Sequence, residues 1–163
     1  MPKLDMDKTD RKILAVLQVN GRLTNQEVAE RVNLSPSPCL RRIRHLEEAG
    51  IIRHYVALLD SDKLGLGLLA YVNVKLEKRR GTSEHEVQGV RTEFEAAVAH
   101  WPEVVGCYAM TCELNYLLRI QVADMQHFSQ FMTETLLKHP AVLELKSDFA
   151  LQTVKETTAL PLA

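Results

Sequence analysis

Apolar positions recur with a helical period up to about residue 60, and then switch between strand-like alternation and helical spacing. A first helix is predicted for residues 7–19, with Asp7 as its N-cap. Thr24 and Glu27 have the spacing of a capping box, which predicts the start of a second helix. The first part of the chain is therefore expected to be helical.

Two prolines lie in the segment LSPSPCLRRIRHLEEAG, residues 34–50, which also carries a helical apolar stripe and three arginines. If Ser35 is an N-cap, Pro36 is the first helical residue and Pro38 the third. The N–H groups of a first helical turn have no acceptor within the helix, so proline loses nothing there. The prolines thus predict the start of a third helix, and Gly50 marks its end.

The third helix is predicted to have two unlike faces, because successive residues turn by about 100°. The apolar face, directed at the first two helices, is expected to contain Cys39, Leu40, Ile43 and Leu46. The opposite face is expected to contain Ser37, Arg41, Arg44, His45 and Glu48, with Pro38 and Arg42 on a flank. A helix that is basic over its N-terminal half suits insertion beside phosphates, N-terminus first.

The remainder of the chain predicts a strand, a helix, two strands, a helix and a strand. The expected segments are 66–78, a helix opened by a Ser83–Glu86 capping box, 104–110, 115–122, a helix between Asp124 and Pro140, and 142–153. This β-α-β-β-α-β order is ferredoxin-like, with two helices on one face of an antiparallel sheet. The predicted class is α+β: a helix-turn-helix domain at 1–60, including a strand-like linker at 51–60, and a ferredoxin-like domain at 61–163.

The apolar spacing also predicts which side chains of the second domain are buried. In the last helix the inward residues are expected to be Met125, Phe128, Phe131, Met132 and Leu136. The final strand is expected to alternate from Leu143 to Leu151. The second face of the sheet would be bare in a monomer, so its apolar side chains predict association of subunits.

Charge and composition narrow the class of function. The net charge of −1 divides into +2 for residues 1–60 (ten Lys/Arg, eight Asp/Glu) and −3 for residues 61–163 (ten and thirteen). A mildly basic front half permits nucleic-acid binding. No run approaches the roughly 18 apolar residues of a membrane span, and no apolar signal segment opens the chain. The protein is therefore expected in the cytoplasm, associated with the nucleoid, with no membrane partner.

Cysteine and histidine spacing predicts neither a metal nor a cofactor. Cys107 and Cys112, with His100 and His127, do not have a recognised zinc spacing. A thiol-sensor role for Cys112 stays open. No spacing suggests the nucleophile, base and orienting group of an active site, so an enzyme is not expected. Ferredoxin-like folds do host enzymes, so the fold alone does not exclude one.

Four segments together resemble one family. They are LDMDKTDRKIL at 4–14, GRLTNQEVAERVNLSPSPCLRRIRHLEEAGII at 21–52, YVALLDSDKLGLGLLAYV at 55–72 and CYAMTCELNYLLRIQVADM at 107–125. The chain resembles the Lrp/AsnC family of bacterial and archaeal transcription regulators over nearly its whole length. The resemblance implies a helix-turn-helix reader of double-stranded DNA, followed by an α/β domain for ligand sensing and assembly. It also implies dimers that gather into tetramers or octamers.

Within that framework the third helix supplies the expected DNA contacts. Ser37 and Arg41 are the expected contacts to base edges, by their face and their nearness to the helix N-terminus. Arg42 and Arg44 are expected at phosphates. The other expected DNA-binding residues are Thr24, Asn25, Ser35, Pro38 and His45. An architectural protein that needs no effector is the alternative within DNA binding.

The resemblance also implies an amino-acid effector near the loop that joins the two central strands. In the family this loop commonly reads Thr-Gly-acidic-x-Asp-Tyr. Here Cys112 stands in place of the glycine, and Asn115 in place of an aspartate whose charge suits a ligand ammonium. The expected effector-binding residues are Tyr108, Met110, Thr111, Cys112, Glu113, Leu114 and Asn115.

Overall fold

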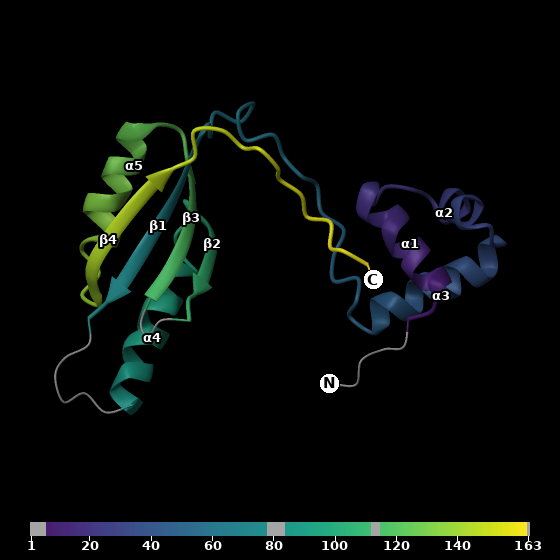
Figure 1. Ribbon diagram of the computed structural model, residues 1–163, viewed down its shortest axis with the longest axis horizontal. Helices are drawn as coiled ribbons and strands as arrows, with labels where there is room; N and C mark the ends of the chain where they lie inside the picture. Colours follow the sequence, from purple (N-terminus) through teal and green to yellow (C-terminus); the bar gives the residue numbers. More distant parts are fainter. Residues whose placement is uncertain (1–5, 78–83, 112–114, 163) are drawn as a thin grey trace. The chain divides into compact units, whose positions relative to one another are not determined.

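The computed structural model describes residues 6–77, 84–111 and 115–162 (Figure 1). The chain divides into two compact units. The first takes in the chain up to Leu58 and again from Lys155, and the second runs from Leu59 to Val154. The break between the units falls near residue 60, and residues 155–162, which were expected in the second domain, belong to the first unit.

Three helices form the first unit. They are α1 (Lys8–Val19), α2 (Asn25–Val32) and α3 (Pro36–Glu48). Asp7 and Thr24 are the N-caps of α1 and α2 as predicted, the predicted capping box of α2 is present, and α1 has one as well. Asn33 follows α2 with a φ of 57°, a left-handed conformation that asparagine tolerates, and this permits a tight turn into α3. The sequence prediction of three helices is therefore confirmed, and Ser35 is the N-cap residue of α3 as expected.

The core of the first unit lies between these helices. Its buried side chains are Ile13, Leu14, Val28, Ala29, Val32, Cys39, Ile43 and Leu46. The prediction for Leu40 was wrong, because its side chain is 37% exposed. At about 100° per residue Leu40 lies about 60° from Ile43 but only about 40° from Arg44, so it falls on the border between the apolar and basic faces.

The segment after α3 is not a strand, contrary to the prediction for 51–60. Strands need a neighbouring backbone for hydrogen bonding, and no strand of the described residues pairs with this segment. Its start is held to α3, because the Tyr55 hydroxyl donates a hydrogen bond to Oε1 of Glu47 over 3.0 Å. Burial and the nearby Glu47 carboxylate raise the pKa of Tyr55 to about 12.

The second unit has the predicted β-α-β-β-α-β order. Its elements are β1 (Leu68–Leu76), α4 (Glu84–Val98), β2 (Val104–Ala109), β3 (Asn115–Val122), α5 (Met125–Phe131), a π-helical turn (Met132–Leu136) and β4 (Val142–Phe149). The sheet is antiparallel with the order β2-β3-β1-β4. Phe94 of α4 and Phe131 of α5 belong to one core cluster with Val72 and Leu118 of the sheet. Both helices therefore cover the same face of the sheet.

Two details of the second unit differ from the prediction. Met125 is 54% exposed, since it is the first residue of α5 and lies at the end of the buried stripe. In β4 a register shift opposite Lys75 and Leu76 places Val142 against the core, which leaves Leu143 exposed. Leu151 lies beyond the strand and is fully exposed.

The other face of the sheet carries the side chains that alternate with the core residues. Tyr71 on β1 and Tyr108 on β2 are both exposed there. The predicted capping box of α4 involves Ser83, which lies outside the described residues. None of the helices in the described segments is long and apolar enough to cross a membrane.

Candidate nucleic-acid interface

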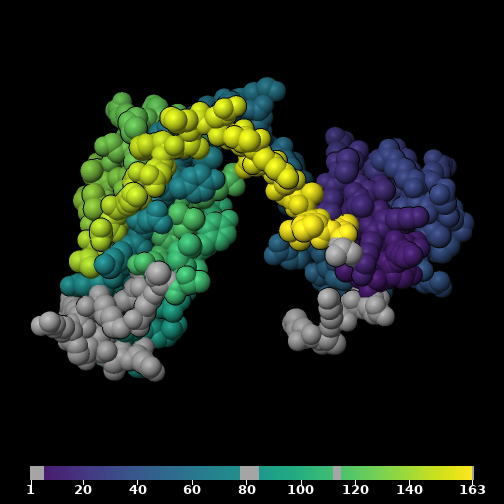
Figure 2. Space-filling view, in the orientation of Figure 1, coloured from purple at the N-terminus to yellow at the C-terminus, as the bar shows by residue number. Residues whose placement is uncertain are grey.

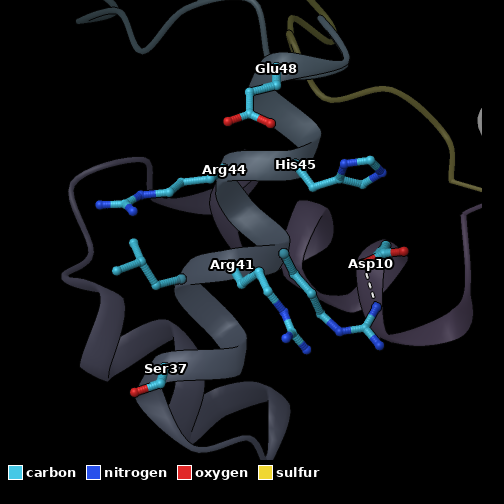
Figure 3. A pocket seen from close by; sticks show the side chains of 8 residues that line it. Asp10, Ser37, Arg41, Arg44, His45 and Glu48 are labelled. Atoms are coloured by element: carbon cyan, nitrogen blue, oxygen red, sulfur yellow. Dashed lines mark hydrogen bonds and ion pairs between the residues drawn. The ribbon is translucent and has the colours of Figure 1, made fainter.

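The outer face of α3 carries three arginines and a histidine (Figure 3). Ser37, Leu40, Arg41, Arg44 and Glu48 follow one another at the i, i+3, i+4, i+7 and i+11 spacing that keeps residues on one side of a helix. They border a shallow, open depression of about 580 Å³. Its lining residues are Asp10, Ser37, Leu40, Arg41, Arg42, Arg44, His45 and Glu48.

Arg41 and Arg44 are exposed and project from α3 in Figure 3. Among the described residues neither forms an ion pair or a side-chain hydrogen bond within the chain. Their ten N–H donors are therefore open to an external acceptor such as a phosphate oxygen or a guanine edge. Ser37, one turn earlier, is also exposed.

Arg42 is arranged differently. Its Nη1 lies 2.7 Å from Oδ2 of Asp7 and 2.8 Å from Oδ1 of Asp10. The Asp10 side chain is only 13% exposed, so this ion pair is partly shielded from water. The sequence interpretation assigned Arg42 to phosphate, whereas the structure pairs it with the N-terminal turn of α1. The i, i+3 spacing of two aspartates was the only sequence signal for this pairing.

Hydrogen bonds within this cluster shift the pKa values of Asp7 and Arg42. The backbone N–H of Asp10, together with the Arg42 guanidinium, holds the pKa of Asp7 below its ordinary value. Hydrogen bonds from Arg42 to Asp10 and then Asp7 raise the pKa of Arg42. The cluster therefore fixes α1 to α3 through charged groups while leaving Arg41 and Arg44 free.

The predicted contacts near the start of α2 have local roles. Thr24 accepts a hydrogen bond from the backbone N–H of Glu27, and its own hydroxyl and N–H donate to the Glu27 carboxylate. Asn25 donates from Nδ2 to the carbonyl of Pro36 over 2.9 Å, which ties the start of α2 to the start of α3. Thr24 therefore caps α2, and Asn25 helps to place the start of α3.

Three further predicted residues lie along the same helix. The Ser35 side chain makes no capping hydrogen bond, so its exposed hydroxyl stays available. Pro38 is half-buried on the flank of α3, and His45 is exposed beside Arg41 and Arg44. The structure thus brings Ser37, Arg41, Arg44 and His45 together around one open depression, which Arg42 also borders although it is paired with Asp7 and Asp10.

The second predicted site lies between β2 and β3, and three of its residues, Cys112, Glu113 and Leu114, are outside the described residues. Tyr108 and Met110 are 55% and 45% exposed, and Thr111 is exposed. Asn115 opens β3, and its side-chain carbonyl is buried without a hydrogen-bond partner in the described parts of the chain. A buried acceptor without a partner is energetically costly.

Next to Asn115 lies a polar group that the sequence interpretation missed. The Tyr116 hydroxyl donates to Oε1 of Glu95 over 2.7 Å and accepts from Nε of Arg91 over 3.2 Å. Burial, together with Glu95, raises the pKa of Tyr116. The same two causes raise the pKa of the Cys107 thiol, which therefore stays protonated near neutral pH.

The described residues contain no group of three or more His, Cys, Asp or Glu side chains that could hold a metal ion.

Comparison with known proteins agrees with this geometry. Residues 6–53 match the family described as winged helix-turn-helix DNA-binding, and residues 69–160 match the Lrp/AsnC ligand binding domain. The chain is 40% identical over 157 residues to the DNA-binding transcriptional activator DecR of Escherichia coli, covering 96% of this chain and 99% of DecR. It is 38% identical over 159 residues to the leucine-responsive regulatory protein of Salmonella typhimurium, covering 98% and 93%.

Solved structures show the same relationship. A transcriptional regulator of Neisseria meningitidis, in complex with L-Met, superposes with a TM-score of 0.87 at 50% identity and covers 96% of each chain. An AsnC family transcriptional regulator of Agrobacterium tumefaciens superposes with a TM-score of 0.85 at 36% identity, covering 96% of this chain and 97% of that one. The chain therefore belongs to the Lrp/AsnC family of DNA-binding transcription regulators.

Proposed function

We propose that this regulator reads DNA with α3 in the major groove, using Arg41 and Ser37 at base edges and Arg44 and His45 at the phosphate backbone. The observation that carries the proposal is the pair of unpaired guanidinium groups on the exposed side of α3. Both lie toward solvent, while Cys39 and Ile43 on the opposite side anchor the helix to its own unit. This is the arrangement of a recognition helix, whose exposed residues contact base edges.

Association of subunits would make this contact specific. Each first unit offers few free cations, so one unit alone should bind weakly. Two recognition helices entering successive major grooves lie about 34–36 Å apart along a pseudo-palindromic site. The exposed Tyr71 and Tyr108 on the uncovered sheet face support a dimer, with tetramers or octamers built from it. Multivalent attachment would then raise the apparent affinity.

The same proposal includes an amino-acid effector beside the loop between β2 and β3. The partnerless carbonyl of Asn115 and the exposed Tyr108 and Met110 support this place. The Neisseria regulator, 50% identical, was solved with L-Met, so methionine is the first amino acid to test. An effector at an assembly contact shifts the oligomer and thereby alters DNA binding without touching DNA.

Alanine substitution of Arg41 tests the DNA contact. If Arg41 reads a base, Arg41→Ala weakens binding to a selected site by about 1–3 kcal/mol and changes binding to random DNA far less. Equal loss on both duplexes would assign Arg41 to phosphate instead. Lys138→Ala, which removes one exposed charge from the second unit, is the matched control. It should leave the ratio of the affinities for selected and random DNA unchanged.

Calorimetric titration with the twenty amino acids tests the effector site. Binding of any one of them should be lost in Asn115→Ala, because the substitution removes the carbonyl acceptor. Unaltered amino-acid binding in that variant would show that the effector site lies elsewhere.

Footprints on DNA that extend over many helical turns regardless of sequence would favour the alternative of an architectural protein that needs no effector.

A further inference from the structure

An apolar side chain lies within the basic surface of α3. Leu40 borders the same depression as Ser37, Arg41 and Arg44, and 37% of its surface is exposed. It follows Ser37 by three residues and precedes Arg44 by four, so it belongs to the same side of the helix. Leu40 also lies in the N-terminal half of α3, the part of a recognition helix that contacts base edges.

Leu40 also borders a second, smaller depression of about 180 Å³, together with Leu23, Val28 and Ile43. It therefore lies between the basic surface of α3 and an apolar part of its own unit, and part of its surface is open to an external apolar group.

Base edges in the major groove offer one apolar group, the 5-methyl of thymine. We propose that Leu40 is a specificity-determining residue that packs against the 5-methyl group of a thymine in each half-site. The inference rests on the proposed insertion of α3 into the major groove. In this arrangement Arg41 and Ser37 supply hydrogen bonds to base edges. Leu40 distinguishes thymine from the other bases by an apolar contact.

The test uses the full-length protein and a duplex selected by it from a random-sequence library. Each thymine of that duplex is replaced in turn by deoxyuridine, which removes only the 5-methyl group. At one thymine per half-site the replacement should weaken wild-type binding by about fourfold, the effect of removing one buried methyl-sized group. Leu40→Ala should bind the thymine and uracil duplexes equally.

Two further variants give the controls. Leu40→Met preserves an apolar side chain of similar volume and should retain the preference for thymine. Val19→Ala truncates an apolar side chain that is 88% exposed in the same unit and does not border the depression, so it should bind like the wild type. Circular dichroism of each variant shows whether the helices are intact.

The outcomes separate this inference from the proposal on which it rests. If no thymine replacement affects the wild type, or if the preference survives in Leu40→Ala, the role of Leu40 is refuted. Weakened binding of Arg41→Ala in the same experiment would then still support the α3 surface. If Arg41→Ala and Arg44→Ala both bind as the wild type does, the α3 surface itself is wrong.

Discussion

Nη1 of Arg42 lies 2.8 Å from Oδ1 of Asp10 and joins α3 to the first turn of α1. The same atom lies 2.7 Å from Asp7. An arginine in the middle of a basic helix is thus used inside the protein rather than offered to DNA. Asp7, the N-cap of α1, and Asp10 thus hold α3 through a residue that lies between Arg41 and Arg44 in the sequence.

Substitution of Arg42 should therefore weaken DNA binding without removing a phosphate contact. We expect Arg42→Ala to lower the thermal stability of the first unit and to reduce affinity, while the slope of log K against log salt stays unchanged. A lost phosphate contact would instead reduce that slope by about 1. Salt-dependent fluorescence anisotropy measures both quantities, and Arg44→Ala provides a variant in which the slope should change.

The change in DNA affinity caused by Asp10→Asn should have opposite signs for the two possible roles of Arg42. If Arg42 positions α3, neutralising Asp10 loosens the contact and weakens binding. If Arg42 serves DNA, freeing its guanidinium and removing a negative charge strengthens binding. Stronger binding by Asp10→Asn would contradict the positioning role.

Asp7 should give the first unit an acid-sensitive component of stability. The folded pKa of Asp7 is lowered from 3.8, first by the Asp10 N–H and also by Arg42. A group with a depressed folded pKa stabilises the fold above its unfolded pKa, and this contribution is lost as pH falls through the folded value. Asp7→Asn keeps an N-cap but loses the charge. Wild type should therefore be more stable than Asp7→Asn near neutral pH, and the difference should shrink as pH falls below the ordinary aspartate pKa and vanish once pH is below the folded pKa of Asp7. A difference independent of pH would contradict this.

Thr24 should matter for stability more than for DNA. Thr24→Ala removes the N-cap of α2 and should lower the free energy of unfolding by about 1 kcal/mol. Thr24→Ser, which keeps the hydroxyl, should recover most of it. When both variants are folded, their DNA affinity should stay within about twofold of the wild type, as expected for a residue that does not contact DNA. A larger loss in Thr24→Ala would show that the N-terminus of α2 also contacts phosphate.

Gln18 should anchor residues 155–162 to the first unit. Its Oε1 accepts from the N–H of Leu160 over 2.6 Å, and its Nε2 donates to the Leu160 carbonyl over 3.2 Å. Figure 2 shows this yellow segment against the purple helices, and Leu162 packs on their core. Gln18→Ala and Leu160→Pro should each lower stability, and the double variant should lose little more than either alone. Fully additive losses in thermal unfolding would refute the anchoring contact.

Local signals made much of this structure predictable. The Thr24–Glu27 spacing and the paired prolines define helix starts, because capping depends on residues close in sequence. Alternation from Ala70 to Leu76 defines β1, because a sheet buried on one face requires it. These features depend on nearby residues alone.

Other features depend on how elements pack, which a periodic pattern does not contain. The pairing of Arg42 with Asp7 and Asp10, for example, follows from the packing of α1 against α3. The π-helical turn at Met132–Leu136 lies inside a segment whose apolar spacing fits an ordinary helix. Such features are decided by tertiary geometry.

The segment held by Gln18 lies 142 residues further along the chain. During synthesis, the ribosome therefore makes α1, α2 and α3 long before it makes the residues that complete their unit. In the sequence the sheet lies between α3 and residues 155–162. It is therefore synthesised before that last segment, and its strands can pair before residues 155–162 are made. A nascent chain released short of Leu162 would carry a finished sensing unit and an unfinished DNA-binding one.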